Sequence, residues 1–224
     1  MGNVDESAYV DTPDWRVPLT ERGHQQAYET GKKLREIIGE DGKVFFYYSP
    51  YRRTRDTVAE FQKHIDPEQI ISMREEPRIS EQQFGNFQNV EQVLESKRER
   101  HEFGRFYYRF KSGEAGLDVY SRVSSFISTL VRDCQQYQKA GYDLDTINVV
   151  IVTHGLSLRL FLMRWFQVSQ VGHLSIMLLF ASFSLCLWFQ IILRLTSSAF
   201  LSVALITSSL WKNLRRQKIL TMQH

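Results

Sequence analysis

The sequence predicts an α/β fold in which helices cover a parallel sheet. Two short apolar runs, at 44–48 and 148–152, are rich in aromatic or β-branched side chains and favour strands buried on both faces. Helical patterns precede and follow each run. This alternation of helix, strand, helix, strand and helix is typical of crossover connections in such a sheet. A length of 224 residues favours one domain.

The first part of the chain contains four further predicted segments. Residues 1–18 have no hydrophobic period and contain Gly, Asn, Asp and Pro, so we expect an open segment. Thr20 is a suitable N-cap, and the apolar stripe behind it predicts a helix that ends at Gly39. After the first apolar run we expect a helix over 52–64 and a short strand at 70–71.

The middle of the chain continues the pattern. Residues 77–88 are rich in Gly and Gln and are expected to be irregular. A densely charged segment is expected to form a helix over 90–110, and a face of apolar residues predicts a second helix over 119–137. After the second apolar run, Gly155 is expected to open a helix that continues to about Phe166.

The charges divide unevenly along the chain. All 25 acidic residues precede Thr146, whereas 7 of the 28 basic residues follow it, sparsely and among Leu, Phe and Ser. Such a distribution does not form the basic face that nucleic-acid binding requires. Cys134 and Cys186 are too few for a disulfide framework, and neither lies in a Cys/His cluster that could hold zinc. We expect no nucleic-acid partner and no metal.

A basic segment follows the first predicted strand. The sequence S-P-Y-R-R-T-R-D-T at 49–57 places Arg52, Arg53 and Arg55 at a strand end and a helix start. Free backbone N–H groups at a helix start and the forked donors of arginine both suit a phosphate. A solvated basic turn is an equally ordinary interpretation, because exposed arginine is common.

Two more candidate residues stand near predicted strand ends. His154 follows the second strand and precedes Gly155, a position that suits a general acid, a base or a phosphate ligand. A lone histidine is nevertheless more often structural. Glu81 lies in a polar loop before two aromatic residues, and burial beside apolar rings would raise its pKa and make it a proton donor. Taken alone, it is more often a surface glutamate.

Taken together, these segments resemble the histidine phosphatase superfamily, which includes the cofactor-dependent phosphoglycerate mutases. L-T-E-R-G-H-Q-Q-A at 19–27 is similar to the family's L-T-x-x-G-x-x-Q-A, and S-P-Y-R-R at 49–53 is similar to its S-P-x-x-R. V-T-H-G at 152–155 resembles V-x-H-G. The resemblance runs from residue 2 to about residue 166. Within the family, the sequence most resembles the plant phosphoglycerate-mutase-like proteins.

The resemblance implies a fold, a mechanism and site residues. The fold is a three-layer α/β/α sandwich. In the family, a histidine attacks phosphorus and carries the phosphoryl group, without metal or cofactor. Asn3, Arg53 and His154 match phosphate-binding positions, His154 would also stabilise the transition state, and Glu81 matches the proton donor.

The family's R-H-G triplet, which carries the nucleophilic histidine, does not occur in this sequence. The resemblance therefore implies a domain over residues 1–166 that is truncated at its N-terminus and lacks the nucleophile and the first central strand. We expect the loss to leave neighbouring strands with unpaired backbone groups, each costing about 1–3 kcal/mol if buried, and to reduce solubility.

Residues 167–224 depart from the family pattern. Residues 174–193 carry no formal charge and are numerous enough to span a bilayer as a helix. Three interpretations remain open: a membrane anchor, a buried helix of the domain, or an altered C-terminus such as a retained intron or a misjoined gene model. The domain itself is expected in the cytoplasm, attached to a membrane only if this tail is an anchor.

The function expected from these patterns is that of a phosphoglycerate mutase-like histidine phosphatase. It would act on a small phosphorylated metabolite or a phosphoprotein through a phosphohistidine intermediate, and this chain is expected to be inactive without the nucleophile. The alternatives are a non-catalytic phosphate-binding pseudoenzyme and a membrane-anchored truncated isoform.

Overall fold

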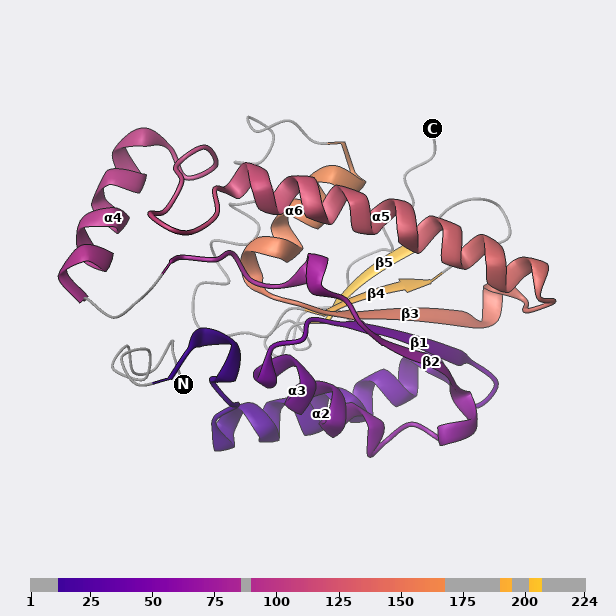
Figure 1. Ribbon diagram of the computed structural model, residues 1–224. Coiled ribbons are helices and arrows are strands. Elements are labelled where there is room, and N and C mark those ends of the chain that lie inside the picture. Colours follow the sequence, from indigo (N-terminus) through magenta and orange to yellow (C-terminus); the bar gives the residue numbers. More distant parts are fainter. Residues whose placement is uncertain (1–11, 86–89, 168–189, 195–201, 207–224) are drawn as a thin grey trace, which may run out of the picture.

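The computed structural model describes residues 12–85, 90–167, 190–194 and 202–206. They form a five-stranded sheet in the order β2-β1-β3-β4-β5 (Figure 1). The first three strands are parallel, and the last two run antiparallel to their neighbours. The strands are β1 (Lys43–Tyr48), β2 (Ile70–Glu75), β3 (Ile147–Val152), β4 (Gln190–Arg194) and β5 (Ser202–Ile206).

Helices cover both faces of the sheet, which confirms the predicted α/β class. In Figure 1, α2 and α3 lie on one face, α5 and α6 lie on the other, and α4 stands off to the side. The α-helices are α2 (Glu21–Ile38), α3 (Arg52–Gln62), α4 (Val90–Phe103), α5 (Gly116–Lys139) and α6 (Gly155–Trp165). Short 3-10 turns are η1 (Asp14–Arg16), η2 (Pro67–Gln69), η3 (Pro77–Ile79) and η4 (Leu144–Thr146).

Alternating side chains of the strands supply the two cores. Val44 and Phe46 of β1 pack with α2 and α3, whereas Phe45 and Tyr47 pack with α5 and α6. Successive side chains of a strand point to opposite faces, so a strand between two helical layers must be apolar at every position. β3 is buried along its whole length for this reason.

Most predicted elements lie within a few residues of the observed ones. Thr20 caps α2 as expected, because its hydroxyl accepts a hydrogen bond of 3.0 Å from the Gly23 N–H. The helix predicted over 90–110 ends earlier, at Phe103. The next residue, Gly104, has a φ of 109°, a left-handed conformation that is incompatible with a continuing α-helix.

The strand β3 is paired along both sides. β1 pairs with it in parallel over all six residues, and β4 pairs with it antiparallel from Asn148 to Val152. The expectation of unpaired backbone groups is therefore not met at this strand, because a segment of the C-terminal region supplies the second partner.

The predicted membrane span at 174–193 is only partly described. Residues 190–193 belong to the strand β4, and residues 174–189 lie outside the described part. Among the described residues, no helix is both long and apolar enough to cross a bilayer. The domain boundary at residue 166 stays a prediction.

Candidate active site

The candidate site lies at the carboxyl ends of β1 and β3. Ser49 follows β1, and Thr153 and His154 follow β3. The two strands are hydrogen-bonded neighbours, and the Ser49 N–H donates to the Val152 carbonyl at 3.0 Å. In open α/β sheets, ligands bind in the crevice outside these strand ends. Residues about a hundred positions apart in the sequence thus meet at one edge.

Arg53 is the arginine of the basic segment that enters this site. Its Nη1 donates to the Asp14 carboxylate at 2.8 Å and to the Asp14 carbonyl at 2.8 Å. Both side chains are mostly buried. Arg52 and Arg55 instead face solvent, where they pair with Asp56 and Glu75. Arg53 therefore holds a carboxylate where a phosphate could be held.

His154 is buried between Arg53 and Ser49. Its Nδ1 lies 3.2 Å from Arg53 Nη2, and its Nε2 lies 2.8 Å from the Ser49 hydroxyl oxygen. Because a guanidinium can only donate, Nδ1 must accept and the proton must sit on Nε2, where it is donated to Ser49. Burial, and then the positive charges of Arg53 and Arg122, hold the pKa of His154 well below its usual range. The ring is neutral.

The Tyr51 ring closes one side of this pair. It lies edge-on to His154 with 4.8 Å between ring centroids, and the Arg53 guanidinium carbon lies 4.7 Å from its centroid. Burial, and then the charge of Asp14, raise the pKa of Tyr51 to about 12. Tyr51 thus remains neutral and provides an apolar wall beside the guanidinium.

Glu81 is half-buried in the loop that follows η3. Burial raises the pKa of this carboxyl above its usual value, although the Gln82 N–H, at 3.1 Å from Oε1, and the charge of Arg53 act in the opposite direction. A raised pKa favours the protonated form of the carboxyl group, which is the form that a general acid needs.

Arg100 of α4 and Arg159 of α6 lie within electrostatic reach of Glu81. Burial lowers the pKa of both guanidinium groups, and the positive charge of Arg105 lowers them further, while the charge of Glu81 acts against the shift. Arginine stays protonated in proteins even when its pKa is lowered, so this side of the site is positively charged.

The structure groups three of the four predicted site residues. Arg53 contacts His154 directly, and Glu81 lies within electrostatic reach of Arg53. Asn3 lies outside the described residues. The predictions did not include Asp14, Ser49 and Arg122, which bind these groups. Within the described residues, no group of His, Cys, Asp and Glu side chains is arranged to hold a metal.

Comparison with known protein families identifies the family of this chain. The family model of the histidine phosphatase superfamily (branch 1) matches residues 9–190, most of the chain. The chain belongs to the histidine phosphatase superfamily. Arg53, Glu81 and His154 all lie in the matched range, and the observed α/β fold agrees with this membership.

Two curated relatives come from Arabidopsis thaliana, as the resemblance to plant proteins implied. The chain is 47% identical over 174 residues to the phosphoglycerate mutase-like protein AT74H, with 74% of this chain and 62% of the relative covered. It is 44% identical over 173 residues to the phosphoglycerate mutase-like protein AT74, with 75% and 55% covered. The chain thus spans little more than half the length of these relatives.

A yeast relative and solved structures extend the comparison. The broad-range acid phosphatase DET1 of Saccharomyces cerevisiae is 44% identical over 96 residues, 42% of this chain and 28% of the relative. The native mycobacterial glucosyl-3-phosphoglycerate phosphatase has a TM-score of 0.57 at 18% identity, with 85% of each chain covered. At that identity the likeness concerns the fold.

Proposed function

We propose that this chain binds the phosphate group of a small phosphate monoester at Arg53, which His154 orients, and that Glu81 is placed to give a proton to the leaving oxygen when a nucleophile attacks the phosphorus. The observation that carries the proposal is the Arg53–Asp14 ion pair beside His154. A carboxylate and a phosphate offer arginine the same pair of acceptor oxygens, so the phosphate would take the place of Asp14. A small phosphorylated metabolite or a phosphoprotein could supply this group.

The three groups have complementary tasks in this proposal. The Arg53 guanidinium would neutralise charge on the phosphoryl oxygens, and neutral His154 would hold that guanidinium in place through Nδ1. When a nucleophile forms its bond to phosphorus, Glu81, whose pKa burial raises, would give its proton to the alcohol oxygen as the P–O bond breaks. A relative named broad-range acid phosphatase is consistent with a phosphate ester as ligand.

His154 is unsuited to the nucleophilic step. Both of its ring nitrogens are engaged, by Arg53 and by Ser49. Attack on phosphorus needs a free nitrogen lone pair directed at the substrate. Because the sequence contains no Arg-His-Gly triplet, we propose that this chain by itself binds phosphate esters without hydrolysing them, and that Glu81 acts as proton donor only when a further histidine supplies the nucleophile. A phosphohistidine mechanism would need a second histidine.

Calorimetry with inorganic phosphate tests the binding proposal. Arg53→Met should weaken binding by about 10- to 100-fold, because a hydrogen bond to a charged group contributes about 1.5–3 kcal/mol. Arg55→Met is the matched control, since Arg55 lies on the same helix but pairs with Glu75 at the surface. Equal affinity of the wild type and the Arg53→Met variant would refute the proposed site.

A turnover assay tests the catalytic part separately. Hydrolysis of p-nitrophenyl phosphate by the 224-residue chain should remain at background. A chain extended at its N-terminus by the family's Arg-His-Gly segment should hydrolyse it, and the additional change Glu81→Gln should slow that reaction. Turnover by the unextended chain would show that another group serves as the nucleophile.

A further inference from the structure

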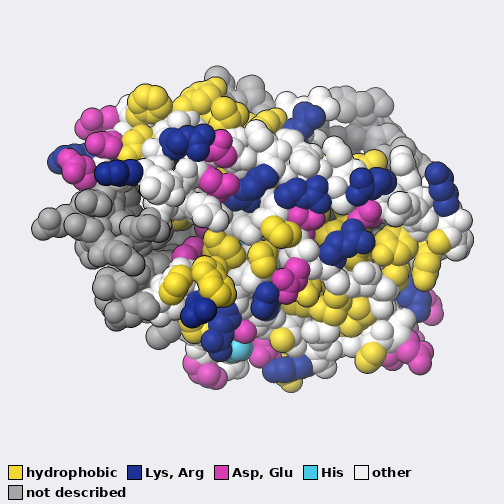
Figure 2. All heavy atoms as spheres, viewed as in Figure 1, with side chains coloured by type: hydrophobic (Ala, Val, Ile, Leu, Met, Phe, Trp, Pro, Cys, Tyr) yellow, Lys and Arg dark blue, Asp and Glu magenta, His cyan; other side chains and the backbone are white. Residues whose placement is uncertain are grey.

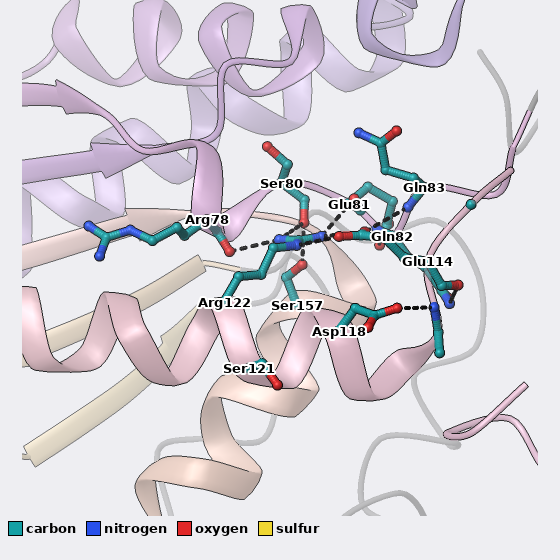
Figure 3. A network of polar contacts seen from close by, with 12 residues as sticks. Arg78, Ser80, Glu81, Gln82, Gln83, Glu114, Asp118, Ser121, Arg122 and Ser157 are labelled. Atoms are coloured by element: carbon teal, nitrogen blue, oxygen red, sulfur yellow. Dashed lines mark hydrogen bonds and ion pairs between the residues drawn. The ribbon is translucent and has the colours of Figure 1, made fainter. Parts of the chain in front are cut away.

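The loop that carries Glu81 is bound through consecutive carbonyl groups to side chains of other elements. Arg122 of α5 donates from Nη1 to the carbonyls of Arg78, at 2.7 Å, and Ser80, at 2.9 Å. Its Nη2 donates to the carbonyl of Glu81 itself, at 3.0 Å. Figure 3 shows the Arg122 side chain extending from α5 to this loop. One guanidinium therefore spans the loop up to the residue proposed as proton donor.

The same loop is held from the other side by Thr153, which precedes His154, and by Ser157 in the first turn of α6. The Thr153 hydroxyl donates to the Ile79 carbonyl at 2.6 Å, and the Ser157 hydroxyl donates to the Ser80 carbonyl at 2.5 Å. The four carbonyls from residue 78 to residue 81 are thus all satisfied by side chains. Backbone groups outside helices and strands need such partners when they are buried.

Glu114 holds Arg122 in place. Its two carboxylate oxygens accept from Arg122 Nε and Nη2, both at 3.0 Å, in the forked geometry that fixes a guanidinium plane. Glu114 also accepts from the Gln83 N–H at 3.0 Å, and its own N–H donates to the Gln83 carbonyl at 2.8 Å. Both ends of the loop are therefore fastened to the same pair of side chains.

Close backbone packing leaves this loop little freedom to shift. A Cβ added at Gly113 would collide with the Gln83 carbonyl oxygen, and one added at Gly85 would collide with the Lys111 carbonyl oxygen. Glycine alone permits such an approach of two backbones. The position of the Glu81 backbone is set by contacts on several sides, of which Arg122 supplies the hydrogen bond to the Glu81 carbonyl itself.

Arg122 also acts electrostatically on both proposed functional groups. Its charge lowers the pKa of Glu81, against the larger effect of burial, and it lowers the pKa of His154 in addition to burial and the charge of Arg53. Acidic side chains accompany many of the basic ones on the face shown in Figure 2. The ion pair of Arg122 with Glu114 differs from an ordinary surface ion pair, because Arg122 also donates hydrogen bonds to carbonyls of the loop that carries Glu81.

We propose that Arg122, oriented by Glu114, is a positioning residue that holds the Glu81 carboxyl partly shielded from water and near the phosphate site. The inference rests on the proposed function, in which Glu81 is the proton donor. Without Arg122 the loop would open to water and Glu81 would titrate as an ordinary exposed carboxyl. If the ion pair of Arg122 and Glu114 served stability alone, removing it would lower the stability of the fold and leave the environment of the Glu81 carboxyl unchanged.

The decisive measurement is the pKa of Glu81 in the ligand-free full chain, followed by NMR of the labelled carboxyl carbon. The Glu81→Gln variant identifies the resonance. In Arg122→Gln, opening of the loop should lower the pKa toward that of an exposed glutamate, because burial is the largest cause of its elevation. If the loop stays closed, loss of a positive charge can only raise it further, so an unchanged or higher pKa overturns the inference.

Other charged groups around Glu81 need to be held constant in this comparison. They belong to elements on every side of the loop and, apart from Arg122 in Arg122→Gln, are the same in each variant. The groups in electrostatic contact with Glu81 are Asp14, Tyr51, Arg53, Arg100, Arg122 and Arg159.

Two further variants guard against a folding defect. Arg109→Gln is the matched control, because Arg109 forms an exposed ion pair with Asp118, which lies on α5 as Arg122 does. This variant should leave the pKa of Glu81 unchanged. Glu114→Gln removes the anchor and keeps the charge of Arg122. It should lower the pKa of Glu81 by a smaller amount, and it decides the question if Arg122→Gln does not fold.

Sulfate binding at several pH values separates this inference from the proposed function. Sulfate keeps its charge across the titration, so wild-type affinity should fall as Glu81 ionises. Glu81→Gln should abolish that fall, and Arg122→Gln should move it to lower pH. A fall in Arg122→Gln at the same pH as in the wild type contradicts the positioning role. If the wild type binds no sulfate at any pH, the proposed function fails, and the NMR titration still decides the role of Arg122.

Discussion

Arg53 and Asp14 form the contact that most directly affects ligand binding. Asp14 offers its carboxylate and its carbonyl oxygen to the same guanidinium, so any incoming anion must displace both. Asp14 is also a negative charge at the place where a phosphate would sit. The segment from Asp14 to Arg16 therefore competes with the ligand proposed for this site.

Replacing Asp14 by asparagine should strengthen phosphate binding. Asp14→Asn removes the competing charge and keeps the shape of the side chain, so we expect about tenfold tighter binding, which corresponds to about 1.4 kcal/mol. Calorimetry with inorganic phosphate measures the change. Asp56→Asn is a suitable control, since Asp56 lies near Arg52 and accepts from the Leu19 N–H outside the site. Weaker binding by Asp14→Asn would show that Asp14 assists the ligand.

His154 should make the stability of the fold depend on pH. Burial holds its pKa well below the value of about 6.5 expected in the unfolded chain, so the unfolded chain takes up the proton first as pH falls. The contribution of His154 is therefore fully present above about pH 6.5 and is lost progressively below it. Urea unfolding at several pH values should show a smaller loss toward pH 5 in His154→Gln.

His101 provides the comparison for that titration. It lies exposed on α4, so His101→Gln should unfold with the wild-type pH dependence. Parallel stability profiles for the wild type and His154→Gln would mean that His154 is as easily protonated in the folded protein as in the unfolded chain.

The residues of the site were only partly predictable from the sequence. Arg53, Glu81 and His154 stand next to strand ends or aromatic residues, and short motifs identify them. Asp14 and Arg122 carry no such local signal, because each acts on groups about forty residues away in the sequence. Pairings at that separation depend on how the helices pack on the sheet.

At the scale of elements, the layered core made most of the fold predictable. β1 and β3 are apolar at nearly every position because helices cover both faces, and this continuous pattern identifies them in the sequence. α2 is equally clear, because Thr20 starts it and Gly39, at a φ of 73°, ends it. The end of α4 was less clear, because the apolar and aromatic residues after Phe103 continue the composition of a helix beyond Gly104.

One polar cluster connects three elements across this core. Asp133 of α5 accepts a hydrogen bond of 2.6 Å from the Tyr47 hydroxyl of β1, and it also accepts from Arg74 of β2. Burial, and then the hydrogen bond to Asp133, raise the pKa of Tyr47. Because a buried carboxylate without partners is costly, this cluster favours one arrangement of α5 on the sheet.

At the scale of the whole molecule, the order of the strands depends on β3. It is the partner of β1 in the parallel part and of β4 in the antiparallel part, and it carries His154 at its end. The sequence did not predict β4 and β5, because a long uncharged run has the composition of a membrane helix as much as of buried strands. The antiparallel pair covers the side of β3 that faces away from β1.

Removal of the β4–β5 pair should expose that side of β3. In a chain that ends at residue 167, amide hydrogens of β3 that face away from β1 should exchange faster, on the order of 10- to 100-fold, because each lost backbone hydrogen bond costs about 1–3 kcal/mol. Amides of β1 that pair with β2 are the internal control, and their protection should persist if the shortened chain still folds. Hydrogen exchange followed by mass spectrometry of overlapping peptides measures both sets.

Equal protection of β3 in the full and shortened chains would contradict the antiparallel pairing. Exchange that accelerates equally in β1 and β3 would show instead that the whole sheet depends on the C-terminal strands.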